Sequence, residues 1–132
     1  TYTITIINSG QAAMTVARED VLTDVLDDTT LVTSPTVDNS SVTVSGPTSG
    51  RLVLGGTLAA GATASVTYTV VVNPESARGN NRADNYLVAP GQTPPAVCEE
   101  STGQCTTTPL PVIVAEKTSN PRRERRSRPI RR

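Results

Sequence analysis

The chain has 132 residues, which suits one domain with a core of its own. It contains no His, Trp or Phe, so the core must be aliphatic, and sites that depend on His general bases or His metal ligands are excluded. The net charge of zero conceals an asymmetry: residues 1–116 hold four Arg against eleven carboxylates, a net charge of −7, and residues 117–132 have a net charge of +7. We therefore expect two parts, a folded domain over residues 1–116 and a basic tail over residues 117–132.

Alternation of apolar and polar residues predicts β-strands at the start of the chain. Tyr2, Ile4 and Ile6 share one face of residues 1–7, and the turn formers that follow end this strand. A second candidate strand covers residues 13–17. Residues 19–30 instead place apolar side chains at helical spacing, which predicts a short helical turn that Thr23 or Asp24 could cap.

Further strands are predicted through the rest of the domain. Short ones cover residues 31–36, 41–45 and 51–54, between turns that contain Pro and Gly. The longest alternating segment is residues 64–72, where we expect Tyr68 and Val70 to lie in the core. Residues 73–81 predict a loop, residues 83–88 a strand, and residues 112–115 a last strand. About seven short strands with frequent turns are typical of an immunoglobulin-like antiparallel β-sandwich, so the predicted fold class is all-β.

The two cysteines, Cys98 and Cys105, enclose a short loop that contains Gly103. Two thiols without His are too few ligands for structural zinc, and their spacing is wider than that of a redox-active CxxC pair. We interpret them as a structural disulfide, with two free buried thiols as the alternative. A disulfide would indicate an oxidising compartment and therefore export. No segment has the roughly 18 apolar residues of a membrane span.

Residues 1–116 resemble the conserved-repeat modules, similar to domain of unknown function eleven, of bacterial and especially actinobacterial cell-surface proteins. The first segment of the chain matches the family's YTVTVTNTG pattern, and residues 58–70 match its G-x-LAPGASATVTYTVTV pattern. Residues 84–88, VLTDVLDD and the CTTTP that begins at Cys105 also resemble the family. The matching positions of the two main patterns are Tyr2, Ile4, Ile6, Asn8 and Gly10, then Leu58, Gly61, Ala64, Val66, Tyr68 and Val70.

The resemblance implies an immunoglobulin-like sandwich that is repeated in tandem along a secreted or surface protein, as a stalk or spacer without catalytic activity. It places a further strand before Thr1, and residues 115–121 resemble the opening of a following repeat. Its partners would be neighbouring repeats of the same parent chain. The family pattern breaks at Arg122–Arg132, where we expect a disordered basic tail that folding does not need.

Other functions compete with this interpretation. The chain could be an adhesin module that contacts a host or matrix protein through loops at residues 37–41 or 73–81. The tail could bind nucleic acid or an anionic surface, but it lacks the interleaved aromatic residues that stack on bases, so we expect no nucleic-acid partner. Without His and without a GxSxG motif, the sequence offers no catalytic triad, and we predict no catalytic residues.

Two site hypotheses remain. Carboxylates gather in residues 20–28 and could hold calcium, although they lack the DxDxDG spacing; Asp residues that cap turns are the alternative, and we predict neither a metal nor another cofactor. Lys117 is the single Lys, and surface sandwiches sometimes cross-link a Lys to an Asn such as Asn85. The carboxylates of the first hypothesis are Asp20, Asp24, Asp27 and Asp28.

Overall fold

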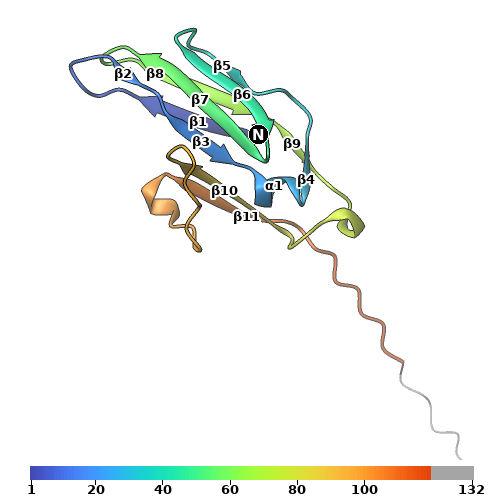
Figure 1. The fold of residues 1–132 in the computed structure, drawn as a ribbon. Helices are drawn as coiled ribbons and strands as arrows, with labels where there is room; N and C mark the ends of the chain where they lie inside the picture. Colours follow the sequence, from blue (N-terminus) through green and yellow to red (C-terminus); the bar gives the residue numbers. More distant parts are fainter. Residues whose placement is uncertain (120–132) are drawn as a thin grey trace, which may run out of the picture.

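The computed structural model describes residues 1–119, and most of its regular structure is β-strand (Figure 1). The prediction of a disordered tail falls for the most part on residues 120–132, outside the described residues. The elements in chain order are β1 (Tyr2–Ile7), β2 (Met14–Thr15), β3 (Arg18–Val21), α1 (Thr23–Leu26), β4 (Thr29–Leu31), β5 (Thr36–Val37), β6 (Val42–Thr48), β7 (Arg51–Leu58), β8 (Thr63–Tyr68), β9 (Val70–Val72), η1 (Glu75–Ala77), β10 (Arg82–Val88), η2 (Glu100–Thr102) and β11 (Cys105–Pro109).

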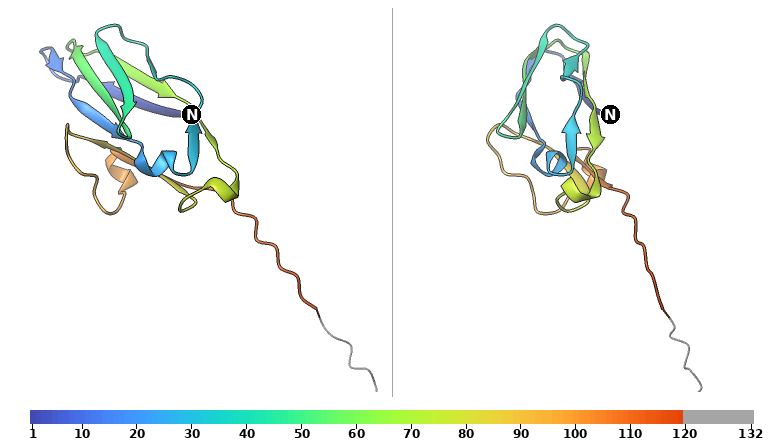
Figure 2. Two further views of the ribbon diagram at one scale, coloured as in Figure 1. Left: turned by 45° about the vertical axis from the view of Figure 1, so that its right-hand side comes forward. Right: turned by 90° about the vertical axis from the view of Figure 1, so that its right-hand side faces the viewer.

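The strands form two antiparallel sheets and one short pair, which pack as a β-sandwich (Figures 1 and 2). The smaller sheet has the strand order β1-β8-β5. The larger sheet has the order β11-β10-β3-β7-β2, with β6 also paired to β7, and β4 pairs with β9. The register of β1 on β8 runs from Tyr2 opposite Tyr68 to Ile7 opposite Thr63. The predicted all-β sandwich is confirmed, with more and shorter strands than the sequence indicated.

The core is aliphatic and falls into two neighbouring clusters. Ile4 and Val44 pack against both clusters and therefore join them. Tyr68, which is 1 % exposed, is the largest fully buried side chain, and its ring stacks on Tyr2 at a centroid distance of 5.2 Å. The buried members are Val16, Val42, Leu54, Leu58, Ala64 and Val66 in one cluster and Leu22, Val25, Leu52, Tyr68, Ala83 and Leu110 in the other.

The long strand predicted over residues 64–72 is interrupted. The chain pairs with β1 up to Tyr68 and then, after Thr69, pairs with β4 as β9. The carbonyl oxygen of Thr69 accepts hydrogen bonds from the backbone N–H groups of Val32 and Thr33 at this change of partner. Tyr68 is core as predicted, whereas Val70 is half-buried at the edge of its cluster and Val72 is exposed.

Two other predicted elements also differ. The last strand is β11, and residues 112–115 form no strand; Val112, Ile113 and Val114 are all exposed there. The predicted helical turn exists as α1, but it is preceded by β3, which occupies residues assigned to the turn. Leu22 stands at the N-cap position without a side-chain hydrogen bond, so neither Thr23 nor Asp24 caps the turn.

The close approach of two strands requires a glycine in β7. Gly56 has φ of +93°, and a Cβ atom there would lie 2.2 Å from the carbonyl oxygen of Ser41, just before β6. Only a residue without a side chain fits both the backbone angle and the space. Gly56 therefore allows β6 and β7 to approach each other closely. The sequence pattern had indicated only a turn at the two glycines of residues 55–56.

Candidate functional site

A buried polar cluster joins the two sheets and is the most unusual chemical feature of the described chain. It consists of Asp20 from β3, Tyr68 from β8 and Asn85 from β10, which are 0 %, 1 % and 8 % exposed. The Tyr68 hydroxyl donates to Oδ2 of Asp20 at 2.7 Å and accepts from Nδ2 of Asn85 at 2.6 Å. The Asn85 amide also lies 3.5 Å from Oδ2 of Asp20. One Asp oxygen is thus well satisfied by two neutral groups.

The other oxygen of the same carboxylate is not satisfied. Oδ1 of Asp20 is buried and has no hydrogen-bond partner among residues 1–119. Burial raises the pKa of Asp20 to about 6, and the hydrogen bonds from Tyr68 and Asn85 reduce this rise. Burial, and after it the charge of Asp20, raises the pKa of the Tyr68 hydroxyl. A buried carboxylate with a free oxygen is ready to accept a cation or a hydrogen-bond donor.

An open seam runs along β1 and leads to this cluster. β1 is an edge strand of the smaller sheet and β11 is an edge strand of the larger one, so each has one side that pairs with no strand among residues 1–119. A groove of about 490 Å³ lies at the Ile7 end of β1, and a smaller pocket of about 130 Å³ lies at the Tyr2 end, lined by Asp20 among others. The two cavities share Thr5, Leu87 and Gln104 in their walls and are therefore continuous.

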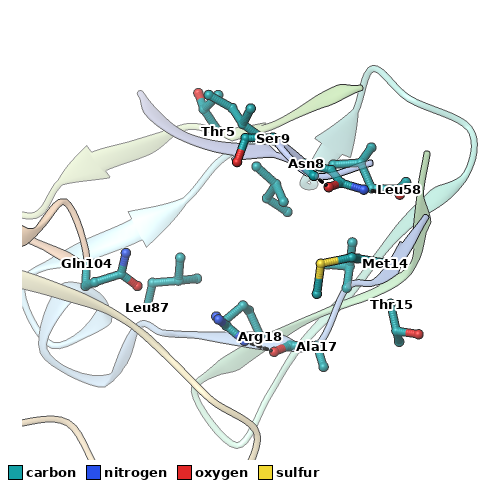
Figure 3. A pocket seen from close by; sticks show the side chains of 14 residues that line it. Thr5, Asn8, Ser9, Met14, Thr15, Ala17, Arg18, Leu58, Leu87 and Gln104 are labelled. Atoms are coloured by element: carbon teal, nitrogen blue, oxygen red, sulfur yellow. Dashed lines mark hydrogen bonds between the residues drawn. The ribbon is translucent and has the colours of Figure 1, made fainter. Parts of the chain in front are cut away.

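Figure 3 shows the wider part of this seam. Thr5 and Ser9 lie on one wall, and Ala17 and Arg18 lie across the groove on the other. Met14, which is 61 % exposed, contributes apolar surface near the end. Asn8 fixes this end of the seam, since its Nδ2 donates to the carbonyl oxygens of Ala12 and Leu58.

Three of the carboxylates proposed for calcium, Asp24, Asp27 and Asp28, lie near one another around α1, and burial, followed by the charges of Asp24 and Asp28, raises the pKa of Asp27 to about 6. Two of them are engaged as hydrogen-bond acceptors. Asp24 accepts hydrogen bonds from the Asn80 side chain and from the backbone N–H of Asp84, and Asp28 accepts from the N–H groups of Asn81 and Arg82. These bonds tie α1 and the segment after it to the start of β10, so the two carboxylates have a structural role, although they do not cap the helical turn itself. Within residues 1–119, no three His, Cys, Asp or Glu side chains are grouped closely enough to hold a metal ion.

Cys98 and Cys105 are joined in a disulfide, with an S–S distance of 2.02 Å and Cα atoms 5.8 Å apart. The bond closes the loop that carries η2 onto the start of β11, so this loop is held beside the seam. Lys117 lies on the exposed segment after β11, which extends from the body in Figure 1, whereas Asn85 is buried. The structure therefore does not bring the Lys117–Asn85 pair together within one chain.

Sequence reasoning noted Asp20 only as a calcium candidate and Asn85 only as a cross-link candidate. It missed their contact through Tyr68, because residues in three separate strands form it.

The described residues include no helix that is long and apolar enough to cross a membrane. A family model described as a domain of unknown function (DUF7927) matches residues 1–110. No curated protein and no solved structure matches the chain.

Proposed function

We propose that this domain, which belongs to the family described as a domain of unknown function (DUF7927), is a non-catalytic structural module. Its role would be that of a stalk or spacer repeat in an exported bacterial surface protein, and its partners would be neighbouring repeats. The immunoglobulin-like architecture and the bacterial surface location are parts of this proposal.

The observation that most strongly supports this proposed structural role is the hydrogen bonding of the buried polar side chains. Each of them hydrogen-bonds to another element or loop, so each holds the fold together. Apart from the free oxygen of Asp20, none presents a reactive group to a cavity in the way that a catalytic site does. The five side chains are Asn8, Asp20, Asp28, Thr29 and Asn85.

The disulfide supports the exported location, because such bonds persist in oxidising compartments. It joins residues only seven apart, and it fixes a loop that has little core beneath it. The bond stabilises this loop by constraining the unfolded chain.

The test is a display experiment. One, two or three copies of the domain are placed between a cell-wall anchor and an epitope tag on a bacterium, and antibody access to the tag is measured. A spacer should increase access with each copy. A flexible Gly/Ser linker of matched residue number serves as control, because it stays more compact than folded modules in series. Access that is independent of copy number, with the domains folded, would contradict the proposal.

The adhesin alternative has its own outcome in the same strains. A module that binds through the loops at residues 37–41 or 73–81 should retain soluble matrix proteins on the cells. Asp38 in the first loop accepts the backbone N–H of Ser65, and the backbone N–H of Gly79 in the second donates to the carbonyl oxygen of Asp27. Both loops are thus tied to the domain, and exchanging their exposed residues should leave spacing unchanged.

A further inference from the structure

The free edge of β1 offers backbone hydrogen bonds to an added strand. β1 pairs with β8 on one side and with no strand of residues 1–119 on the other. Exposed strand edges of this kind are templates for β-strand addition, in which the main chain supplies affinity and the alternate side chains supply specificity. The seam beside this edge is apolar where it is wide, at Ile7, Met14 and Leu58.

The smaller pocket, at the Tyr2 end of the seam, favours a positively charged side chain. Asp20, whose buried Oδ1 has no hydrogen-bond partner among residues 1–119, lines the pocket there together with Tyr2 and Thr3. An unpaired carboxylate in such a place is costly, and a cationic side chain that enters the pocket would remove that cost. A strand that fits the seam should therefore carry apolar residues toward the Ile7 end of β1 and a cation toward the Tyr2 end.

Residues 111–117, which we call the arm, have this pattern. The arm is extended and its side chains are exposed, with Ile113 82 % exposed. Its first residues are held to the loop around η1, because the carbonyl oxygen of Pro111 accepts from Arg78 and the N–H of Ile113 donates to Glu75, and the rest leaves the body in Figure 1. In a strand, Ile113, Ala115 and Lys117 would share one face, because side chains alternate. Lys117 is the only Lys of the chain, and it lies about 13 Å from Ile113 in a strand, the distance covered by five residues of β1.

We propose that the arm of one copy of this chain adds to β1 of a second copy as an antiparallel strand, with Ile113 and Ala115 over the groove and Lys117 paired with Asp20. In an antiparallel pairing the arm runs from the Ile7 end of β1 to its Tyr2 end, which brings Lys117 to the carboxylate of Asp20. The inference rests on the proposed structural role, because it supplies the joint between successive modules.

The arm cannot make this contact with its own seam. β11 ends at Pro109, opposite Arg82, and the Tyr2 hydroxyl interacts with Thr108, so the arm begins at the Tyr2 end of β1. An arm that folded back from there would run parallel to β1 and would carry Lys117 away from Asp20. The contact between copies is therefore head-to-tail, an open arrangement that joins modules in a row rather than closing into a symmetric dimer.

The experiment measures binding of a fluorescent peptide with the sequence of residues 111–119 to the full chain, by anisotropy. We expect saturable binding, weakened about tenfold or more by Ile113→Asp, because burial of a charge costs more than 1.4 kcal/mol. Val114→Asp is the matched control, since Val114 lies on the opposite face, and it should change the dissociation constant by less than about threefold. Lys117→Gln should weaken binding to the wild-type chain but not to its Asp20→Asn variant.

Self-association of the full chain is followed by sedimentation. Ile113→Asp should reduce self-association and Val114→Asp should not, and both results should hold at low salt and at molar salt. At molar salt the screening length is about 3 Å, so contacts made by the charges of the basic tail are suppressed. Absence of peptide binding, or equal losses from the two Asp substitutions, would overturn the proposal. Such a result would leave the display experiment unaffected, because that experiment joins its modules covalently.

Discussion

Replacing Asp20 by Asn should stabilise the protein at neutral and alkaline pH. Burial raises the pKa of Asp20 from 3.8 to about 6, so the folded state binds the proton more tightly than the unfolded chain does. The stability gained from this proton is complete below the unfolded value of 3.8 and is lost as the pH rises through about 6. This rise in the pKa of Asp20 corresponds to roughly 3 kcal/mol in the free energy of unfolding.

The variant keeps the shape of the side chain and removes the charge. We expect Asp20→Asn to be more stable than the wild type by up to about 3 kcal/mol near pH 8, and to differ little near pH 4. Urea unfolding of both proteins across this range gives the difference directly, and effects of other groups cancel in it. Glu99→Gln is the control, because Glu99 is exposed and its profile should follow the wild type. A variant that is less stable than the wild type by a constant amount at every pH would refute the reasoning.

Three further predictions concern the fold. Leu52→Ala should lower the free energy of unfolding by about 2–5 kcal/mol, because Leu52 is 0 % exposed in the core; urea unfolding measures this, and a loss under 1 kcal/mol would contradict the packing described. Gly56→Ala should be much more destabilising than Gly61→Ala, since a Cβ at Gly56 meets a backbone oxygen whereas nothing lies within 4 Å at Gly61; equal melting temperatures would exclude this explanation. Replacing Cys98 and Cys105 by Ser should cost about 2–3 kcal/mol and increase proteolysis of the loop, and unchanged cleavage rates would show that the bond is not what holds it.

The strands with a clear alternation could be predicted from the sequence. β1 and β10 lie where the pattern places them, because one face of each contacts the core and the other faces solvent. β11 was missed, since its Thr-rich sequence has no apolar face, and residues 112–115 were predicted instead because three aliphatic residues suggest burial. The break after Tyr68 was also invisible, because apolar alternation continues while the strand changes its partner.

The candidate site was harder to predict than the fold. Nothing local distinguishes Asp20 from the other acidic residues of its segment, and charged residues are seldom fully buried. Its burial follows from the pairing of β3 with β7 and β10, which long-range contacts decide. Tyr68 could be assigned to the core from its strand, but its hydroxyl has partners only because β3 and β10 of the other sheet bring Asp20 and Asn85 to it.

The pairing of β1 with β8 has a consequence for synthesis of the chain. Tyr2 is translated well before its partner Tyr68, so β1 has no strand to pair with until β8 has been made. During that time it is an unprotected apolar segment of the kind that aggregates. A variant in which residues 1–10 are moved to follow residue 110 would shorten the delay between the synthesis of the two strands.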